Sequence, residues 1–488
     1  MTISAWTSLV NIWDYNVYWA NIVQIAIVCA ILLVSNAIRR KVKFIRNSLM
    51  PTAIIGGFLG LGIKYLLMGI ADWTNIPEIA ILTNDFLGVI TYHALALGFI
   101  AIGLKEVEKN KETGKAIGRP IKSGLFIVCN YVLQGILGLV ITIGLSFVFT
   151  KVAPYAGVLL PMGYGQGPGQ AFNIGTIFQT AGFEGGQSYG LMIATMGFVS
   201  ASVGGVIYLN VMAKKGKLKR KNNEGMSESQ EGGYVEATNE IPLVESVDKL
   251  TIQVALVGVT YLLTWVILTA LTLAIDNSGV NFLINSVKPL LWGFNFIFSI
   301  AMANLVKFII KRLKKRKLMN RTYTNNYMLN RVSGVAFDFM IIASIMAIDV
   351  QAISNWGSII SLIIICVLGA VVTMWYDSYV SKRVYKGYEQ EAFLVFYGTM
   401  TGTASTGIAL LREIDPEFKT PAATEIVTGS STAIMFGFPL FLITGVIFNG
   451  WWWIIGSLAL LIVMFIVFHF FLLHEPKNKT AKPVAQKE

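Results

Sequence analysis

Residues 161–173 read Pro161-Met-Gly-Tyr-Gly-Gln-Gly-Pro-Gly-Gln-Ala-Phe-Asn173 and lie between two long apolar segments. Pro168 and the density of glycine exclude a continuous helix through this stretch. Because apolar sequence flanks it on both sides, we expect the stretch to lie at membrane depth. Lipid cannot satisfy free N–H and C=O groups, so non-helical chain survives there only when buried in protein or beside a wet cavity. The stretch therefore predicts a buried break inside a membrane-spanning bundle.

The second half of the chain repeats this break with the same spacing. The pattern Tyr-Gly-x-x-x-Gly-x-Ala of residues 164–171 returns at residues 397–404. Apolar segments that are interrupted at corresponding positions in two halves of a membrane protein are the best sequence indication of a transporter's binding site.

The composition places most of the chain in a bilayer. It has 488 residues, of which 55% are hydrophobic and 14% are charged, and its mean hydropathy is +0.63. Soluble domains have about one quarter charged residues. The net charge of +12 comes from short basic runs between apolar segments. This pattern is typical of cytoplasmic membrane loops and does not indicate a nucleic-acid partner.

Eleven apolar segments are each about long enough to cross a bilayer. They occupy residues 17–38, 50–70, 80–104, 122–150, 188–212, 249–275, 285–310, 328–350, 356–381, 421–447 and 451–473. Residues 1–16 are predicted to lie at the membrane interface, and residues 213–248 form a polar linker. The two interrupted inserts cover about 158–182 and 391–412.

The distribution of basic residues sets the expected orientation. Basic clusters occupy 39–46, 105–122, 214–221, 311–321, 382–386 and 477–487, and we expect all of them in the cytoplasm. These cytoplasmic positions are consistent with one another only if the insert 158–182 enters and leaves the membrane from outside and the insert 391–412 enters and leaves it from inside. The N-terminus is then outside and the C-terminus is cytoplasmic.

The predicted fold is an all-α polytopic membrane protein with two inverted structural repeats of five transmembrane helices. Residues 17–212 form repeat 1 and residues 249–447 form repeat 2, each with one re-entrant hairpin, and the cytoplasmic linker 213–248 joins them. Residues 448–488 add an extra transmembrane helix and a cytoplasmic tail. Weak internal matches support this arrangement, such as Gly88-Val89 with Gly334-Val335 and Thr195 with Thr428.

The two hairpins supply the predicted substrate site. Glycine lets the backbone approach a ligand closely, and free N–H groups at half-helix starts bind carboxylates. The candidates are Gly165, Gln166, Gly167, Gly169, Gln170, Asn173, Thr195, Gly398, Thr399, Gly402, Thr428 and Ser431. The alternative for each small residue is close helix packing, which we favour for Gly197 and for Gly204-Gly205.

A coupling cation is expected at oxygen atoms near the second hairpin. Thr401, Thr403 and Ser405 offer hydroxyls, and Asp338 offers an intramembrane carboxylate, which by default indicates function. The alternative is that Asp338 is a structural partner between helices. No other cofactor is expected. The chain shows no zinc-type spacing, nucleophile elbow or phosphate loop, so we do not expect an enzyme.

The chain resembles the bacterial glutamate:sodium symporter family in three stretches. These are Met50-Pro51-Thr-Ala-Ile-Ile-Gly56-Gly57, the Gly-x-Gly-x-Gly of residues 165–169, and Tyr397-Gly-Thr-Met-Thr-Gly-Thr-Ala404. Family members more often have a Gly-Gly-His-Gly type of first hairpin, where this chain has Met-Gly-Tyr-Gly-Gln-Gly.

The resemblance implies sodium-coupled symport of glutamate or a related anionic substrate. It also implies a homodimer in a bacterial inner or plasma membrane, in which hairpins and adjoining spans move as an elevator against a scaffold. The alternative is a proton- or sodium-coupled carrier of another organic anion. An ion channel would need a continuous pore and a membrane sensor would need a folded signalling domain, so both are disfavoured.

Overall fold

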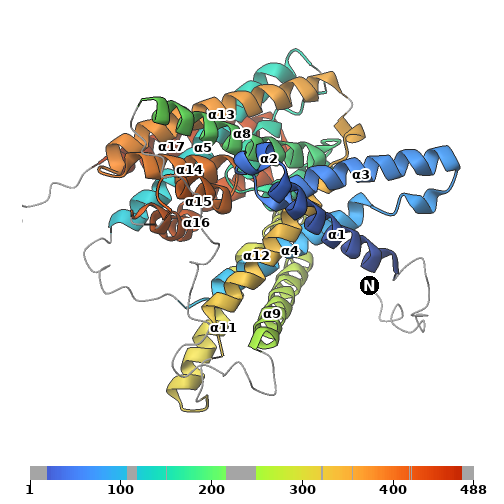
Figure 1. Cartoon of the computed structure of the whole chain (residues 1–488), viewed down its shortest axis with the longest axis horizontal. Helices are drawn as coiled ribbons and strands as arrows, with labels where there is room; N and C mark the ends of the chain where they lie inside the picture. The colour runs from blue at the N-terminus through green and yellow to red at the C-terminus, as the bar shows by residue number, and fades with distance from the viewer. Residues whose placement is uncertain are drawn as a thin grey trace, which may run out of the picture.

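The computed structural model describes residues 19–106, 118–149, 151–215, 249–319, 323–353, 355–416, 418 and 420–474 (Figure 1). Every regular element in these ranges is helical. The predicted interfacial segment 1–16, nearly all of the linker 213–248 and the tail after residue 474 lie outside the described residues, as does the side chain of Ser431.

Ten helices in the part of the chain that the structure describes are long and apolar enough to cross a membrane. They are α1 (Ala20–Lys41), α3 (Thr52–Thr74), α4 (Asn84–Leu104), α5 (Gly118–Ser146), α8 (Gly186–Lys214), α9 (Lys249–Ser278), α12 (Asn326–Met346), α13 (Trp356–Val384), α16 (Ala422–Val446) and α17 (Trp451–Leu473). The prediction of an all-helical, multi-pass membrane protein is confirmed at this level. Each helix lies within a few residues of an apolar segment identified in the sequence.

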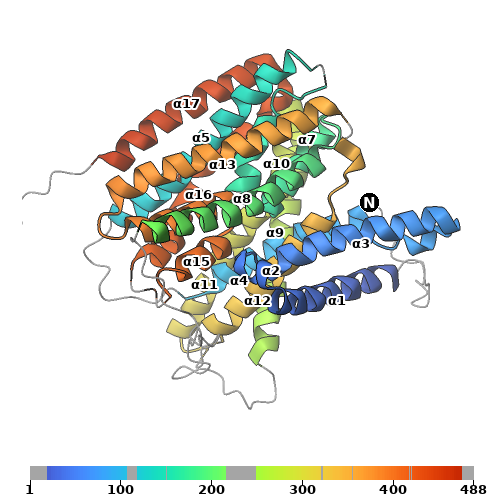
Figure 2. The same cartoon turned by 45° about the horizontal axis from the view of Figure 1, so that its top comes forward.

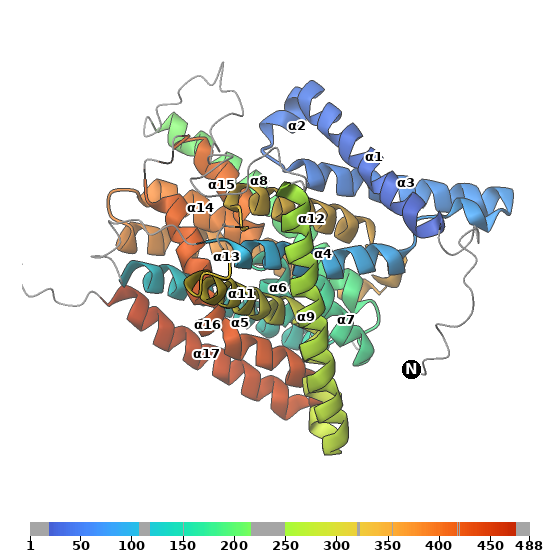
Figure 3. The same ribbon diagram turned by 90° about the horizontal axis from the view of Figure 1, so that it is seen from below.

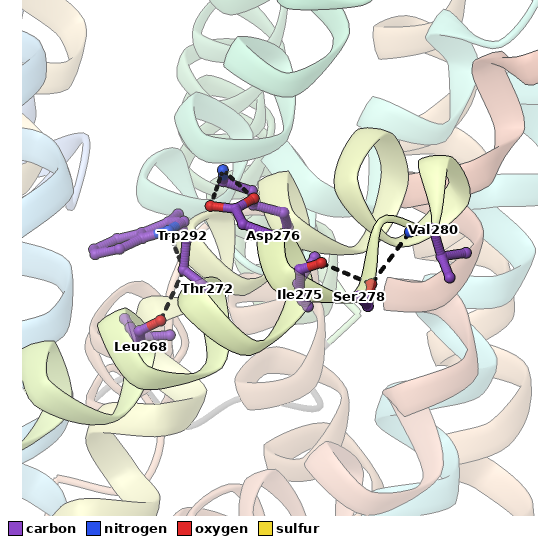
Figure 4. A network of polar contacts seen from close by, with 8 residues as sticks. Leu268, Thr272, Ile275, Asp276, Ser278, Val280 and Trp292 are labelled. Carbon is purple, nitrogen blue, oxygen red and sulfur yellow. Dashed lines mark hydrogen bonds and ion pairs between the residues drawn. The ribbon is translucent and has the colours of Figure 1, made fainter.

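The span predicted over 285–310 differs from the prediction because it is bent. A π-helical turn, η6 (Leu283–Val287), and α10 (Lys288–Gly293) precede α11 (Asn295–Lys315), and the pair bends by 62°. Figure 4 shows what fixes this segment to the end of α9. Lys288 Nζ lies 2.7 Å from Asp276 Oδ1, and Trp292 Nε1 donates to Thr272 Oγ1 at 3.0 Å.

Short helices occupy both predicted inserts. The first contains η5 (Ala156–Val158), α6 (Leu159–Tyr164) and α7 (Pro168–Thr180), and the second contains α14 (Glu389–Thr401) and α15 (Ala404–Arg412). The remaining short elements are α2 (Lys43–Asn47), η3 (Pro77–Ile79), η7 (Gln351–Ile353) and η8 (Ile447–Asn449). The chain therefore stops being helical close to the glycines that predicted both breaks.

The helices form two groups that meet along α7 (Figures 2 and 3). In the first bundle α4 packs on α12, α3 packs on α12, α11 packs on α4, and α1 and α9 flank α3 and α11. The second bundle contains α5 to α8 and α13 to α17, with α5 beside α13, α16 and α17. Helix α7 packs on α8 within its own bundle and also contacts α4 and α12 of the first.

Small residues set the close approach of α3 to α12. A methyl group added at Gly56 would lie 2.7 Å from Ile342 Cδ1, and one added at Gly57 would lie 2.6 Å from Ile345 Cβ. Membrane helices associate through packing of this kind, because lipid supplies no hydrophobic drive between them. The stretch that resembles the symporter family at its second span thus contributes a packing surface.

A buried lysine ties α3 to the end of α12. Lys64 is 2% exposed. Its Nζ donates to Asn84 Oδ1 at 2.8 Å and to the carbonyl oxygens of Met346 and Ile348, each at 2.7 Å. Carbonyls at a helix C-terminus have no partner in their own helix and attract positive charge. Lys64, in the middle of α3, therefore satisfies carbonyl groups at the end of α12.

A second lysine makes a corresponding contact. Lys307 of α11 donates to the carbonyl oxygen of Lys105, which follows the last residue of α4, at 3.1 Å. Helix α11 packs on α4 as α3 packs on α12. In each pair, a lysine on the packing helix thus bonds a carbonyl at the end of its neighbour.

Replacing Lys64 with methionine tests this anchor. Lys64→Met keeps a long apolar side chain but leaves buried acceptors unpaired, at about 1–3 kcal/mol for each. We expect a marked fall in the melting temperature of the purified protein in detergent. Lys307→Met removes one bond from a half-buried lysine and should lower the melting temperature less. Equal losses in the two variants would contradict the anchor.

Candidate functional site

The first break lies between α6 and α7 at Gly165–Gly167. Gly167 has φ +86° and ψ −177°, a conformation that side-chain-bearing residues rarely adopt, and Pro168 opens α7. The carbonyl oxygen of Gly165 accepts from Tyr131 Oη of α5 at 3.1 Å. The break is therefore held by a neighbouring helix and directs the N-terminus of α7 into the protein.

The second break lies between α14 and α15 at Gly402 and Thr403. The two helices pack antiparallel, since a methyl group added at Gly398 would lie 2.7 Å from Gly407 Cα. The Met400 carbonyl oxygen, in the last turn of α14, accepts from Gln134 Nε2 of α5 at 2.9 Å. Gly398 is thus a packing residue inside the hairpin, whereas Gly402 and Thr403 form its tip.

The two tips meet in the interior of the second bundle. The Cβ position of Gly167 would lie 3.5 Å from Thr403 Cγ2 and 3.9 Å from the Gly402 carbonyl oxygen. The repeated tyrosines also converge, because Tyr164 Oη lies 3.0 Å from Ser200 Oγ and Tyr397 Oη donates to the Ser200 carbonyl at 3.0 Å. Residues that are far apart in the sequence therefore form one buried site.

Two predicted glutamines in the first tip have side-chain atoms without hydrogen-bond partners among the described residues. Gln170 is 2% exposed, and neither Nε2 nor Oε1 has a partner; Gln166 Nε2 is likewise unpaired. Gln170 lies in the first turn of α7, where backbone N–H groups have no helical acceptor. Buried unpaired groups are costly, so their presence at a helix start suits an anionic ligand.

Asn173 has a structural partner. Its Nδ2 donates to the Gly293 carbonyl oxygen at the end of α10 at 2.7 Å, and its Oδ1 has no partner in the described residues. Asn295, two residues beyond Gly293, is 1% exposed and lies beside the phenols of Tyr92 and Tyr261. Asn173 thus joins α7 to the bend before α11, which the sequence did not indicate.

The predicted hydroxyls mostly bond within their own helices. Thr195, Thr399, Thr401 and Thr428 each donate to the carbonyl four residues earlier, at 2.9, 2.6, 2.7 and 2.9 Å. This is the usual behaviour of threonine in membrane helices. The hydroxyl hydrogen is committed in each case, while the oxygen lone pairs are still able to contact a ligand.

Two predicted ligands lie away from the tips. Thr428 is on α16, where the next residue, Gly429, packs on Ser123 of α5. The tips contact α5 at Tyr131 and Gln134, which lie roughly 12–16 Å further along that helix. Thr428 therefore lies apart from the tips in this structure, because α16 packs along the first turns of α5.

Asp338 is also separated from the tips. It is an exposed residue of α12, one turn before Ile342, which faces Gly56 of α3. Met340, two residues on, is the α12 residue that approaches Gly169 of α7, and residues two apart on a helix face different sides. Asp338 is not a ligand at the tips in this arrangement. Ser405 is exposed in the first turn of α15.

Asp377 of α13 is a buried carboxylate that the sequence reasoning did not single out. It is 0% exposed, and neither carboxylate oxygen has a hydrogen-bond partner among the described residues. Lys64 was missed in the same way. Both are charged residues inside apolar spans, the signal that drew attention to Asp338, so the same rule applied throughout the chain would have found them.

Glu425 of α16 is, in contrast, fully paired. One carboxylate oxygen accepts from Ser123 Oγ in a short hydrogen bond, and the other accepts from Tyr388 Oη at 3.2 Å. Ser123 Oγ also lies 3.0 Å from Tyr385 Oη. Burial, reinforced by the Glu425 carboxylate, raises the pKa of Tyr388, so its phenol stays a donor at neutral pH. This group is a structural junction of α5, α14 and α16.

A cavity of about 280 Å³ lies between the bundles, where α4 faces α7 and the start of α8. Its polar lining includes Asn84, Asp85, Tyr92, His93 and Gln187. Movement of α7 against α4 would change its shape. Its volume is in the range of a small organic molecule.

Comparisons with protein-family models, with curated proteins and with solved structures return no match to the chain. The resemblance to glutamate:sodium symporters therefore rests on the quoted motifs and stays a prediction.

Cysteines at Gln166 and Thr403 test whether the tips meet. Gln166 adjoins Gly167, which is itself unsuitable because of its positive φ. In a background lacking Cys29, Cys129 and Cys366, we expect a short bifunctional thiol reagent to bridge the pair. A protease site engineered within 216–248 separates the halves, so bridged protein keeps its full-length mobility on a denaturing gel. The pair of Gln166→Cys with exposed Ser405→Cys is the control, and equal bridging of both pairs would contradict the arrangement.

Proposed function

We propose that the chain is a secondary active transporter that couples the entry of sodium to the uptake of glutamate or a related anionic amino acid or carboxylate. The observation that carries the proposal is the meeting of two broken helices, with Gly167 of one tip against Thr403 of the other. Broken helices in transporters present free N–H groups to an anion and free carbonyls to a cation.

The proposed architecture has two inverted repeats, α1 to α8 and α9 to α16, with α17 as an extra helix. It counts the bent pair α10–α11 as one of eleven crossings and treats both tips as re-entrant. Two features support it: α3 packs on α12 as α11 packs on α4, and Lys64 and Lys307 bond the ends of those partner helices. Asn84 and Asn330 each accept from a lysine Nζ, one turn before Gly88 and Gly334 respectively.

The anion is proposed to bind at the start of α7. The N-terminus of a helix carries a partial positive charge, and Gly167 and Gly169 let a ligand approach the backbone there. Gln170, buried and unpaired, would donate Nε2 to a carboxylate oxygen. This recognition needs no charged side chain and contacts only a carboxylate group. It therefore serves glutamate and other carboxylates alike.

The proposed movement is an elevator in which the second bundle slides against the first. Both tips belong to the second bundle, so the site would travel with it. At the contact between bundles, the Cβ position of Gly169 would lie 2.7 Å from Leu95 Cδ1 and 2.9 Å from Met340 Sδ. Because Gly169 has no side chain, the surface of α7 is smooth at this contact, and such a surface suits sliding. The first bundle would form the scaffold and, as the resemblance implies, the contacts of a homodimer.

A proton-coupled carrier of another organic anion is the alternative. Asp377 is the observation that favours this alternative, because a buried carboxylate is able to carry a proton through the membrane. Uptake into proteoliposomes decides between these functions. We expect labelled glutamate to accumulate with an inward sodium gradient, and not when potassium replaces sodium or when only a pH gradient is applied. Accumulation driven by the pH gradient alone would favour the alternative.

Glycine variants test the site. We expect Gly169→Val and Gly402→Val to abolish uptake while protein remains in the membrane. At Gly169 the side chain would press on Leu95 and Met340, and at Gly402 a Cβ would lie 3.0 Å from the Gly398 carbonyl oxygen. Gly62→Val is the matched control, because nothing lies within 4 Å of a Cβ at Gly62. Normal uptake by both site variants would return these glycines to a packing role.

Single cysteines test the proposed topology. We expect cysteines at Ser227 in the linker and at Lys482 in the tail to resist an impermeant thiol reagent on intact cells. A cysteine at Ser278, at the end of α9, should react. Positive charge is retained in the cytoplasm, which is the reason for this orientation. Labelling of Ser227→Cys from outside would contradict the inverted repeats.

A further inference from the structure

Polar side chains of α5 and α13 face one another at successive helical turns, beside the tips. Gln134 Nε2 donates to Thr373 Oγ1 at 2.9 Å. One turn along each helix, Asn130 lies beside Asp377, close enough to act on its carboxylate. Ser381 follows one turn further on the same face of α13. All five side chains belong to the second bundle.

Several buried oxygen atoms on these helical turns have no hydrogen-bond partner in the described part of the chain. Asp377 and Asn130 are 0% exposed, and Gln134 and Ser381 are 1% exposed. Among the described residues, both carboxylate oxygens, Asn130 Oδ1, Gln134 Oε1 and Ser381 Oγ have no hydrogen-bond partner.

The amide nitrogens of this group point elsewhere. Asn130 Nδ2 donates to the Phe126 carbonyl oxygen at 3.2 Å, and Gln134 Nε2 is shared between Thr373 Oγ1 and the Met400 carbonyl. Within the described structure, the two amide oxygens are left without partners on the helical turns beside a buried carboxylate, an arrangement that is costly unless positive charge lies among them.

We propose that Asp377, Asn130, Gln134 and Ser381 bind a hard monovalent cation, with sodium as the first to test. One carboxylate balances one positive charge, and neutral amide and hydroxyl oxygens complete a shell of the kind that hard cations use. A proton on Asp377 would supply one donor and the Ser381 hydroxyl a second, whereas five oxygen atoms here have no hydrogen-bond partner among the described residues. A divalent ion would leave an uncompensated charge in the membrane interior.

Glu425 shows that burial alone does not produce this pattern. It is 4% exposed, yet hydroxyl donors from Ser123 and Tyr388 satisfy both of its carboxylate oxygens. The chain thus pairs one buried carboxylate with hydroxyl donors and leaves both oxygens of the other without a hydrogen-bond partner among the described residues. Asp377 is accordingly the better candidate for a cation ligand.

The site is connected to the second tip. Gln134 contributes an oxygen to the cluster, and its nitrogen holds the Met400 carbonyl, which precedes the tip at Gly402 and Thr403. A bound cation would fix Gln134 and hence the end of α14. The role of this site in coupling rests on the proposed function, whereas the binding of a cation to it does not.

Thermal unfolding of the purified full-length protein in lipid nanodiscs tests the binding. Sodium chloride replaces choline chloride at constant ionic strength and fixed pH. We expect the melting temperature of the unaltered protein to rise saturably with sodium, since a ligand that binds only the folded state stabilises it. Asp377→Asn should lose this rise, and Asn130→Ala should raise the half-saturating sodium concentration at least several-fold.

Control variants separate the site from general charge effects. Asp276→Asn, an exposed carboxylate paired with Lys288, should keep the sodium response unchanged. Should Asp377→Asn fail to give a single folded peak in gel filtration, Asn130→Ala and Ser381→Ala carry the test. Unchanged half-saturation in both would overturn the site. Loss of the response in Asp338→Asn with a normal response in Asp377→Asn would also overturn it.

Three further outcomes are decisive. A melting temperature that depends on pH through Asp377 but not on sodium would replace the cation with a proton and overturn the proposal. Failure of glutamate uptake, with the sodium response intact and dependent on Asp377, would overturn the proposed substrate and leave the cation site standing. Sodium-driven uptake that is normal in Asp377→Asn would overturn the cation site and leave the proposed transport function standing.

Discussion

The structure depends on one constraint: a polar backbone group inside a bilayer must find its partner within the protein. Two segments, at Gly165–Gly167 and at Gly402 and Thr403, stop being helical between candidate membrane spans, and both lie within the second bundle. Tyr131 donates to the carbonyl oxygen of one break and Gln134 to a carbonyl beside the other. The tips also cover each other, at Gly167 and Thr403. Helix α5 thus supplies the donors for both breaks, which makes it the support on which the site is built.

The same constraint explains the charged residues inside the spans. Lys64 is tolerated because three acceptors surround its ammonium, two of them carbonyls at the end of α12. Glu425 is tolerated because hydroxyls donate to both of its oxygens. Asp377 has no such donors among the described residues. Of these three buried charges it alone lacks compensation by side chains or backbone, and this separates a binding role from a structural one.

Hydropathy and charge predicted the helices well, because a span must be about twenty apolar residues long whatever its neighbours are. Glycine and proline likewise located both breaks. The bend at Phe294 escaped prediction because it depends on contacts of Trp292 and Lys288 with α9. The separation of Thr428 and Asp338 from the tips escaped prediction for a related reason: the face that a helix residue presents is decided by packing partners, as Ser123 and Gly56 show. The meeting of Gly167 with Thr403 likewise requires the assembled bundles.

The energetics of an anion carrier favour placing the cation away from the anion's own ligands. Moving one elementary charge across 100 mV costs or yields about 2.3 kcal/mol, so an anion entering a negative cell needs at least one accompanying positive charge. A cation at Asp377 would be neutralised by that carboxylate, and the bundle would carry no net charge there. With the anion at the start of α7, the loaded bundle would carry one net negative charge unless a second cation joined it. Gln134 links these requirements, because it contacts both the Asp377 cluster and the end of α14. The coupling then resides in α5, the helix that already supports both breaks.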